Sequence, residues 1–247
     1  MVFRPLPIFT AFCIPLFAAL MALGVWQLQR LHWKLGLIDE MNAHLHAAPI
    51  SFDTIVKLPS QDAQYRRVAL SGHFRNDQEV YVYAATEGGL PAYHVIVPFV
   101  FDGGRMIFFD RGIVPPNLKE PATHRAGLLE GEQQIVGVWR TPDAPGFFTP
   151  PPDLAHRVWY SRDIAGMAKA LHVAPAAPVI VEADAAPVPG GWPRGGQTIV
   201  ALPNDHLQYA LTWFLLSGSL LVFYFAYHRA QGRLEFGTVR KRGRMED

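Results

Sequence analysis

The chain has 247 residues, of which 50% are hydrophobic and 17% charged, and its formal net charge is +1. This composition is too apolar for a disordered protein and rather apolar for a soluble one. The near-balance of charges lacks the basic surplus of a nucleic-acid binder, so no nucleic-acid partner is expected. The single cysteine, Cys13, excludes an intrachain disulfide and a cysteine-cluster metal site.

Two uncharged apolar segments predict two transmembrane helices. Residues 5–29 would form a helix about 37 Å long, against a hydrocarbon core of roughly 30 Å, and residues 207–227 one of about 31 Å. A cleaved signal peptide is the alternative for the first segment, because residues 22–24 fit a cleavage site, but the apolar run is longer than a signal core. A buried helix of a globular protein is the alternative for the second segment. We expect both segments to lie in a lipid bilayer.

The charges beside these segments predict the topology. The flanks 1–4 and 228–247 carry seven basic and three acidic residues, whereas the region between the segments carries 15 basic and 18 acidic residues. Short positive flanks remain on the cytoplasmic side of a membrane. We therefore expect a cytoplasmic N-terminus at 1–4, a basic cytoplasmic tail at 228–247 and a domain at 30–206 outside the cytoplasm. In a bacterial cell this is a multi-pass inner-membrane protein with a periplasmic domain.

The region between the segments has the pattern of a folded β-rich domain. Leucines at helical spacing after Trp26 extend the first helix to about residue 48. Alternating hydrophobicity and turn residues then predict successive hairpins, with one amphipathic helix at 163–171 introduced by Ser161. The predicted strands are residues 65–74, 79–83, 93–101, 106–109, 133–140, 157–160, 179–182 and 197–202. We expect an extracytoplasmic α+β domain dominated by antiparallel β-structure, as a sheet or a partly closed barrel.

Two loops rich in proline or glycine interrupt the strand series, at residues 142–152 and 187–196. They contain the aromatic residues Phe147, Phe148 and Trp192. Such loops either fold over their own domain or contact lipid headgroups or a partner protein.

The sequence contains no motif of a catalytic site. A Gly-x-Ser-x-Gly elbow, a phosphate loop and a His-Glu-x-x-His helix are all absent from it. His44 and His46 have a spacing that would suit a metal, but solvent exposure is the commoner fate of such a pair. The sequence therefore predicts a protein that is not an enzyme, and a membrane-anchored periplasmic enzyme is the less favoured alternative.

The most informative cluster lies at the start of the second apolar segment. On a helix, His206, Tyr209 or Ala210, and Trp213 share one face, which places an imidazole near aromatic rings. An aromatic belt with an interfacial histidine is one interpretation, although Trp213 would lie about 10 Å deeper than His206 and beyond a belt. A haem held by an axial imidazole is the other interpretation, with His206 as the ligand of the haem iron. Periodicity by itself favours helix packing.

Residues of the first helix lie at the same predicted depth as His206. Gly24 permits close approach of a neighbouring helix, and Gln27 is placed to hydrogen-bond across the helix pair. Arg30 would either contact a propionate of the same ligand or extend to a lipid phosphate.

Ordered sequence blocks between residues 24 and 214 carry a family resemblance. The blocks are Gly24-Val25-Trp26-Gln27-Leu28-Gln29-Arg30, Trp33-Lys34, Tyr93-His94-Val95-Ile96-Val97-Pro98-Phe99, Arg111-Gly112-Ile113-Val114-Pro115, Trp159-Tyr160-Ser161-Arg162-Asp163, Pro189-Gly190-Gly191, Gly195-Gly196-Gln197-Thr198, Asn204-Asp205-His206-Leu207-Gln208-Tyr209 and Thr212-Trp213-Phe214. With an apolar segment at each end, they resemble the Surfeit locus protein 1 family, membrane proteins that assist the assembly of haem-copper terminal oxidases.

The resemblance implies a role in supplying or stabilising haem during maturation of the catalytic subunit of the oxidase. It implies that haem a, or haem o, is contacted transiently by His206 and Trp213. Helical spacing and predicted depth add Tyr209, Gln27 and Arg30 as further candidate contacts. The implied partners are the catalytic subunit of a haem-copper oxidase and haem-synthesis enzymes. The alternative is a haem-free scaffold that stabilises an oxidase assembly intermediate.

Overall fold

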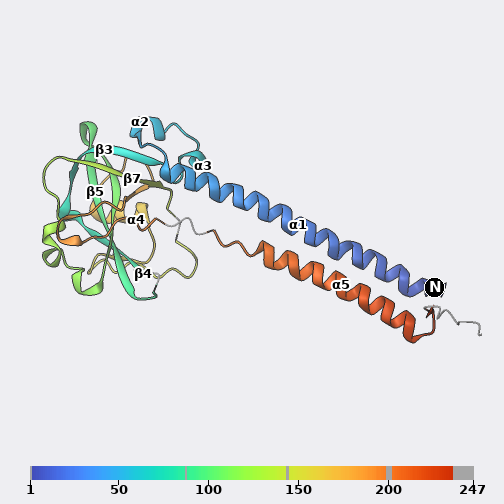
Figure 1. The fold of residues 1–247 in the computed structure, drawn as a ribbon. Coiled ribbons are helices and arrows are strands. Elements are labelled where there is room, and N and C mark those ends of the chain that lie inside the picture. Colours follow the sequence, from blue (N-terminus) through green and yellow to red (C-terminus); the bar gives the residue numbers. More distant parts are fainter. Residues whose placement is uncertain (1, 87, 143–144, 199–201, 236–247) are drawn as a thin grey trace, which may run out of the picture. The chain divides into compact units, whose positions relative to one another are not determined.

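The computed structural model describes residues 2–86, 88–142, 145–198 and 202–235. The chain divides into two compact units, which are described separately. The helix unit contains Met1–Ile38 and Leu202–Asp247, and the sheet unit contains Asp39–Ala201 (Figure 1). The sheet unit thus lies within the predicted domain at 30–206.

The helix unit consists mainly of two long antiparallel helices (Figure 1). These are α1 (Pro7–His46), whose last turns belong to the sheet unit, and α5 (His206–Ala230). Both are long and apolar enough to cross a membrane. The short strands β1 (Val2–Phe3) and β10 (Leu234–Glu235) pair antiparallel beside them. Because α1 is continuous to His46, the helical spacing after Trp26 identified its extension correctly.

The sheet unit contains the remaining elements. Its strands are β2 (Ile50–Ser51), β3 (Arg67–Phe74), β4 (Val80–Ala85), β5 (Pro91–Phe101), β6 (Arg105–Val114), β7 (Gln133–Arg140), β8 (Val158–Trp159) and β9 (Ile180–Ala183). Its helices are α2 (Phe52–Ile55), α3 (Ser60–Ala63) and α4 (Ile164–Leu171). Short 3₁₀ turns are η1 (Asn76–Gln78), η2 (Asp102–Gly104), η3 (Pro116–Leu118), η4 (Pro121–Thr123), η5 (Arg125–Gly127) and η6 (Pro189–Gly191). Each strand predicted before residue 183 is present, whereas residues 199–201 of the one predicted at 197–202 lie outside the described residues.

The strands form one mixed sheet in the order β2-β3-β7-β9-β6-β5-β4-β8. An additional pairing of β3 with β5 closes strands β3, β7, β9, β6 and β5 into a ring. The longest ladders are antiparallel, but β2 with β3, β4 with β8 and β6 with β9 pair in parallel. Antiparallel pairing therefore dominates, as expected, but the sheet is mixed and not purely antiparallel. A helical connection such as α4, between β8 and β9, allows a strand to enter a sheet in parallel with its neighbour.

Two local expectations were wrong. The segments at 65–74 and 79–83 do not form a hairpin with each other, because the 11-residue β5 pairs with β4 along its first half and with β3 at its end. Helix α4 is capped by Asp163, whose carboxylate accepts the N–H of Gly166, and not by Ser161. Local turn residues do not encode the long-range pairing that decides both strand neighbours and chain direction.

The two faces of the strands bury two apolar clusters. The larger cluster takes side chains from every strand of the ring, including Val68, Phe99, Phe109, Trp139 and Val181. The smaller cluster lies on the opposite face, where Phe108 and Ile180 pack with Ile164 and Met167 of α4. Neighbouring residues of β6 therefore point into different environments, as expected for a strand.

Candidate functional site

The helix unit brings His206 of α5 against Gln27 of α1. The distance between His206 Nδ1 and Gln27 Oε1 is 2.7 Å, so the cross-helix hydrogen bond predicted for Gln27 is present. An amide oxygen only accepts, so the proton is assigned to Nδ1 and the lone pair to Nε2. No hydrogen-bond partner for Nε2 occurs among the described residues. The imidazole is thus fixed at one nitrogen and open at the other.

Close packing of the two helices supports this contact. A Cβ atom added at Gly24 would lie 2.5 Å from the ring of Phe214, so only glycine allows this approach without a shift of the ring. Ala210 and Ser217 on α5 are buried, and the Ser217 hydroxyl donates to Met21 Sδ at 3.2 Å. Small residues on facing helices therefore hold the His206 region of α5 against α1.

The other predicted site residues of α5 differ in their surroundings. Trp213 is partly buried, and its indole N–H is buried with no acceptor among the described residues. Tyr209 is 55% exposed, whereas Ala210 is 1% exposed and takes the buried position on this turn. Helical periodicity allowed either Tyr209 or Ala210 to share the face of His206 and Trp213. In the structure, the small residue Ala210 is the one that is buried.

The basic residues of α1 near Gln27 make local contacts. Arg30 is exposed, and its guanidinium carbon lies 3.9 Å from the centre of the Trp33 ring, a cation–π contact one turn along the helix. Lys34 donates to the carbonyl oxygen of Pro203, ahead of α5. Neither contact engages His206.

A second histidine lies at the opposite end of the helix pair. His228 is fully buried; its Nε2 accepts the N–H of Leu6 at 3.1 Å, and its Nδ1 donates to the carbonyl of Tyr224 at 2.8 Å. The rings of Phe3 and Phe9 pack around it at centroid distances of 5.2 and 5.8 Å. Both nitrogens are occupied, so His228 joins the chain ends and has no free position for a ligand. No periodic signal in the sequence connects it to Leu6.

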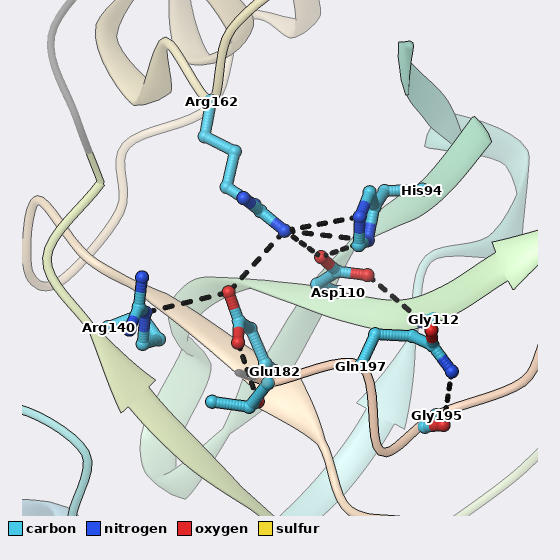
Figure 2. A network of polar contacts seen from close by, with 9 residues as sticks. His94, Asp110, Gly112, Arg140, Arg162, Glu182, Gly195 and Gln197 are labelled. Carbon is cyan, nitrogen blue, oxygen red and sulfur yellow. Dashed lines mark hydrogen bonds and ion pairs between the residues drawn. The ribbon is translucent and has the colours of Figure 1, made fainter. Parts of the chain in front are cut away.

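The sheet unit contains a buried polar network on the α4 side of β6 (Figure 2). Asp110 Oδ2 lies 2.8 Å from His94 Nδ1 and 3.2 Å from Arg162, and Asp110 Oδ1 accepts the N–H of Gly112. Arg162 also pairs with Glu182 at 3.4 Å. Burial raises the pKa of the Asp110 carboxyl, but the charges and hydrogen bonds of its partners outweigh this and lower it. Both oxygens of Asp110 are satisfied by the fold.

A second polar cluster lies on the opposite face of β6, around Glu79. Tyr81 donates to Glu79 Oε1 at 2.5 Å, and His124 Nε2 lies 3.4 Å from the same oxygen. Glu79 raises the pKa of His124 through a hydrogen bond and its charge, against the effect of burial. Arg111, from β6, is also buried here. Neither cluster was found from the sequence, although a charged pair, Asp110-Arg111, inside an apolar strand is a usable signal.

The histidine pair considered as a metal site is engaged with the backbone. His44 Nδ1 lies 3.1 Å from the carbonyl oxygen of Gln64, and His46 Nδ1 lies 2.7 Å from that of Asn42. Within the described ranges, no group of three or more His, Cys, Asp or Glu side chains is arranged to hold a metal ion.

Comparison with known proteins gives a consistent result. Residues 14–218 match the model of the SURF1 family. Surfeit locus protein 1 of Xenopus tropicalis is 37% identical over 213 residues, which cover 79% of this chain and 68% of the relative. Surfeit locus protein 1 of Homo sapiens is 34% identical over 220 residues, covering 82% and 72%. A SURF1-like protein of Drosophila melanogaster is 34% identical over 221 residues, covering 82% and 71%.

The matched region includes Gln27, His206 and Trp213, and it extends through the whole sheet unit. Since the family model spans most of the chain and relatives exceed 30% identity over most of their own length, this protein belongs to the SURF1 family.

Proposed function

We propose that this protein is a non-enzymatic assembly factor for a haem-copper terminal oxidase, and that it carries haem a or haem o as cargo at the His206 end of the helix pair. The observation that supports this proposal is the 2.7 Å hydrogen bond between His206 Nδ1 and Gln27 Oε1. A ligating histidine is normally oriented in this way by a partner on its second nitrogen. His206 Nε2 would then be the atom that holds the haem iron.

The surroundings of His206 fit an apolar, planar cargo with a polar edge. Trp213 offers a large apolar surface, and its unpaired indole N–H is available as a donor to an acceptor of the cargo. Tyr209 follows His206 by three residues on α5, and Arg30 follows Gln27 by three residues on α1. Both are exposed, so an incoming ligand can reach the phenol ring and the guanidinium. When bound, the haem supplies the iron and macrocycle that the oxidase subunit needs, while the protein binds and orients it.

The proposed membrane placement rests on the distribution of charge. With both helices in the bilayer, the basic flanks favour an orientation with both termini in the cytoplasm and the sheet unit in the periplasm of a bacterial cell. In this orientation, His206, at the first turn of α5, lies at the periplasmic end of its span. The catalytic subunit of the oxidase and haem-synthesis enzymes are the proposed partners there.

The test is the absorption spectrum of the full chain purified from cells that make haem a. Wild type is expected to carry haem, and His206→Ala is expected to lose it, because the substitution removes the iron ligand. His32→Ala is the matched control, since His32 is an exposed histidine of α1 whose loss leaves the helix contact intact. Equal haem content in wild type and His206→Ala would remove His206 from the site.

A haem-free scaffold is the second candidate, and one observation favours it. Phe147 and Phe148 are 95% and 92% exposed on a turn that is closed by two hydrogen bonds between Gly146 and Thr149. Exposed aromatic side chains on a structured turn suit contact with another protein. A colourless wild-type protein that copurifies with the oxidase subunit, and loses it on Phe147→Ser with Phe148→Ser, would favour the scaffold.

A further inference from the structure

Arg111 is a buried cation with an unused pair of donors. The residue is 4% exposed, and its Nη2 donates to the carbonyl oxygen of Gly127. Its Nη1 is buried and has no acceptor among the described residues. Burial lowers the pKa of the guanidinium to about 10, so it remains charged at neutral pH. A buried charged group with unpaired donors is costly unless something else satisfies them.

Arg111 forms part of the wall of a cavity of about 230 Å³ in the sheet unit. The cavity lies among side chains of β3, β6, β7 and β9 and the segment after β9, and most of its wall is apolar, including Phe74, Leu129, Ile135 and Val188. The guanidinium carbon of Arg111 lies 4.9 Å from the centre of the Phe74 ring, which belongs to the same wall. An apolar cavity of about 150 Å³ is enough to bind benzene, so this one has room for a ring and a small polar group.

Two carboxylates lie near Arg111, and neither accepts a hydrogen bond from it. Asp184 also lines the cavity, but it forms an ion pair with Arg67 at 2.5 Å. Glu79 directs Oε1 to Tyr81 and His124, and its charge acts on Arg111, but its second oxygen is buried without a hydrogen-bond partner among the described residues. Glu79 thus balances part of the charge of Arg111, while the Nη1 donors have no acceptor among the described residues.

We propose that this cavity is a binding site for a small apolar monocarboxylate, whose carboxylate accepts from Arg111 Nη1 while its ring or short acyl chain fills the apolar part. A carboxylate is the preferred partner of a guanidinium, because both hydrogen bonds and charge are satisfied together. A neutral molecule of the same shape leaves the donors unpaired and binds more weakly. This site lies in the sheet unit and does not depend on the haem site proposed in the helix unit.

The test uses ¹⁹F NMR of 3-(4-fluorophenyl)propionate added to the full chain in lipid nanodiscs, with empty nanodiscs as the baseline. The probe signal is expected to broaden and shift with the wild-type chain. The neutral analogue 3-(4-fluorophenyl)propanol is expected to bind at least about 10-fold more weakly. Arg111→Met is expected to reduce carboxylate binding to the level of the alcohol. Arg125→Met, which removes a charge from an exposed position outside the cavity wall, is the matched control and should bind as wild type.

A second variant separates binding from folding. Ala186 is exposed at the cavity wall, so Ala186→Phe blocks the space without changing a charge or a core residue. It should abolish binding while the melting temperature stays near that of wild type. Equal binding of carboxylate and alcohol, or wild-type binding by Ala186→Phe, would overturn the proposal.

Discussion

The two histidines between α1 and α5, His206 and His228, make the same kind of contact through Nδ1 and differ in the contact of Nε2. His206 and His228 each engage Nδ1 with an oxygen, at 2.7 and 2.8 Å. Nε2 of His228 accepts a backbone N–H from Leu6, whereas Nε2 of His206 has no partner among the described residues. A histidine that is satisfied at both nitrogens stabilises the fold, and one that is oriented but open is suited to bind a ligand.

The same distinction separates the two charged neighbours of β6. Asp110 has protein partners for both of its oxygens, on the face covered by α4. Arg111, on the opposite face, has donors without an acceptor and lies in a cavity wall. His228 and Asp110 are therefore expected to matter for stability, and His206 and Arg111 for binding. The predictions below test this division.

The largest expected effect is on His228. His228→Ala removes a fully buried ring and leaves the Leu6 N–H without its acceptor, so we expect the full chain in detergent to lose about 3 kcal/mol of stability. His206→Ala, at a partly exposed position, is expected to cost less than about 1 kcal/mol. Thermal unfolding followed by circular dichroism measures both. Similar losses of stability in the two variants would contradict the assignment of a structural role to His228 and a binding role to His206.

The sequence predicted part of this division. The cross-helix contact of Gln27 followed from helical periodicity and matched depth in two antiparallel spans, which are local properties of each segment. His228 was not found, because its partner Leu6 is 222 residues away and precedes the helix. Asp110 and Arg111 are charges in an apolar strand, but their partners His94, Arg162 and Gly127 come from other parts of the sheet unit. Pairing in a mixed sheet, and hence which charges meet, depends on long-range packing that no local pattern encodes.

A second prediction concerns Asp110. Asp110→Asn removes a carboxylate partner of Arg162, and we expect a loss of about 2 kcal/mol at pH 7. Because the pKa of Asp110 is lowered in the folded state, its contribution is present above the unfolded value near 3.8 and is lost as the pH falls through the folded value. Melting curves of wild type and variant should therefore converge in acid. A gap that stays constant down to pH 2 would contradict the assignment.

A smaller effect is expected at His124. Its raised pKa means that the charged imidazole stabilises the fold below its ordinary value of 6.5, and that this contribution disappears as the pH rises through the raised value. Melting temperatures measured between pH 6 and pH 9 should fall more for wild type than for His124→Gln. An equal fall in the two proteins would mean that His124 contributes no charged imidazole beside Glu79.

The smallest effect on stability, and the most specific on binding, is expected at Gln27. Gln27→Leu removes the acceptor that fixes the Nδ1 proton of His206, so the proposed haem site should bind several-fold less haem. The free energy of unfolding should change by less than about 1 kcal/mol.

Gln27→Glu keeps an acceptor and adds a negative charge, which makes the imidazole a stronger donor to iron. It should restore haem content and lower the reduction potential of the bound haem, as measured by redox titration of the purified protein. A helix-packing role alone predicts no change in potential between Gln27→Glu and wild type, so the potential distinguishes a residue that positions His206 from one that only joins the two helices.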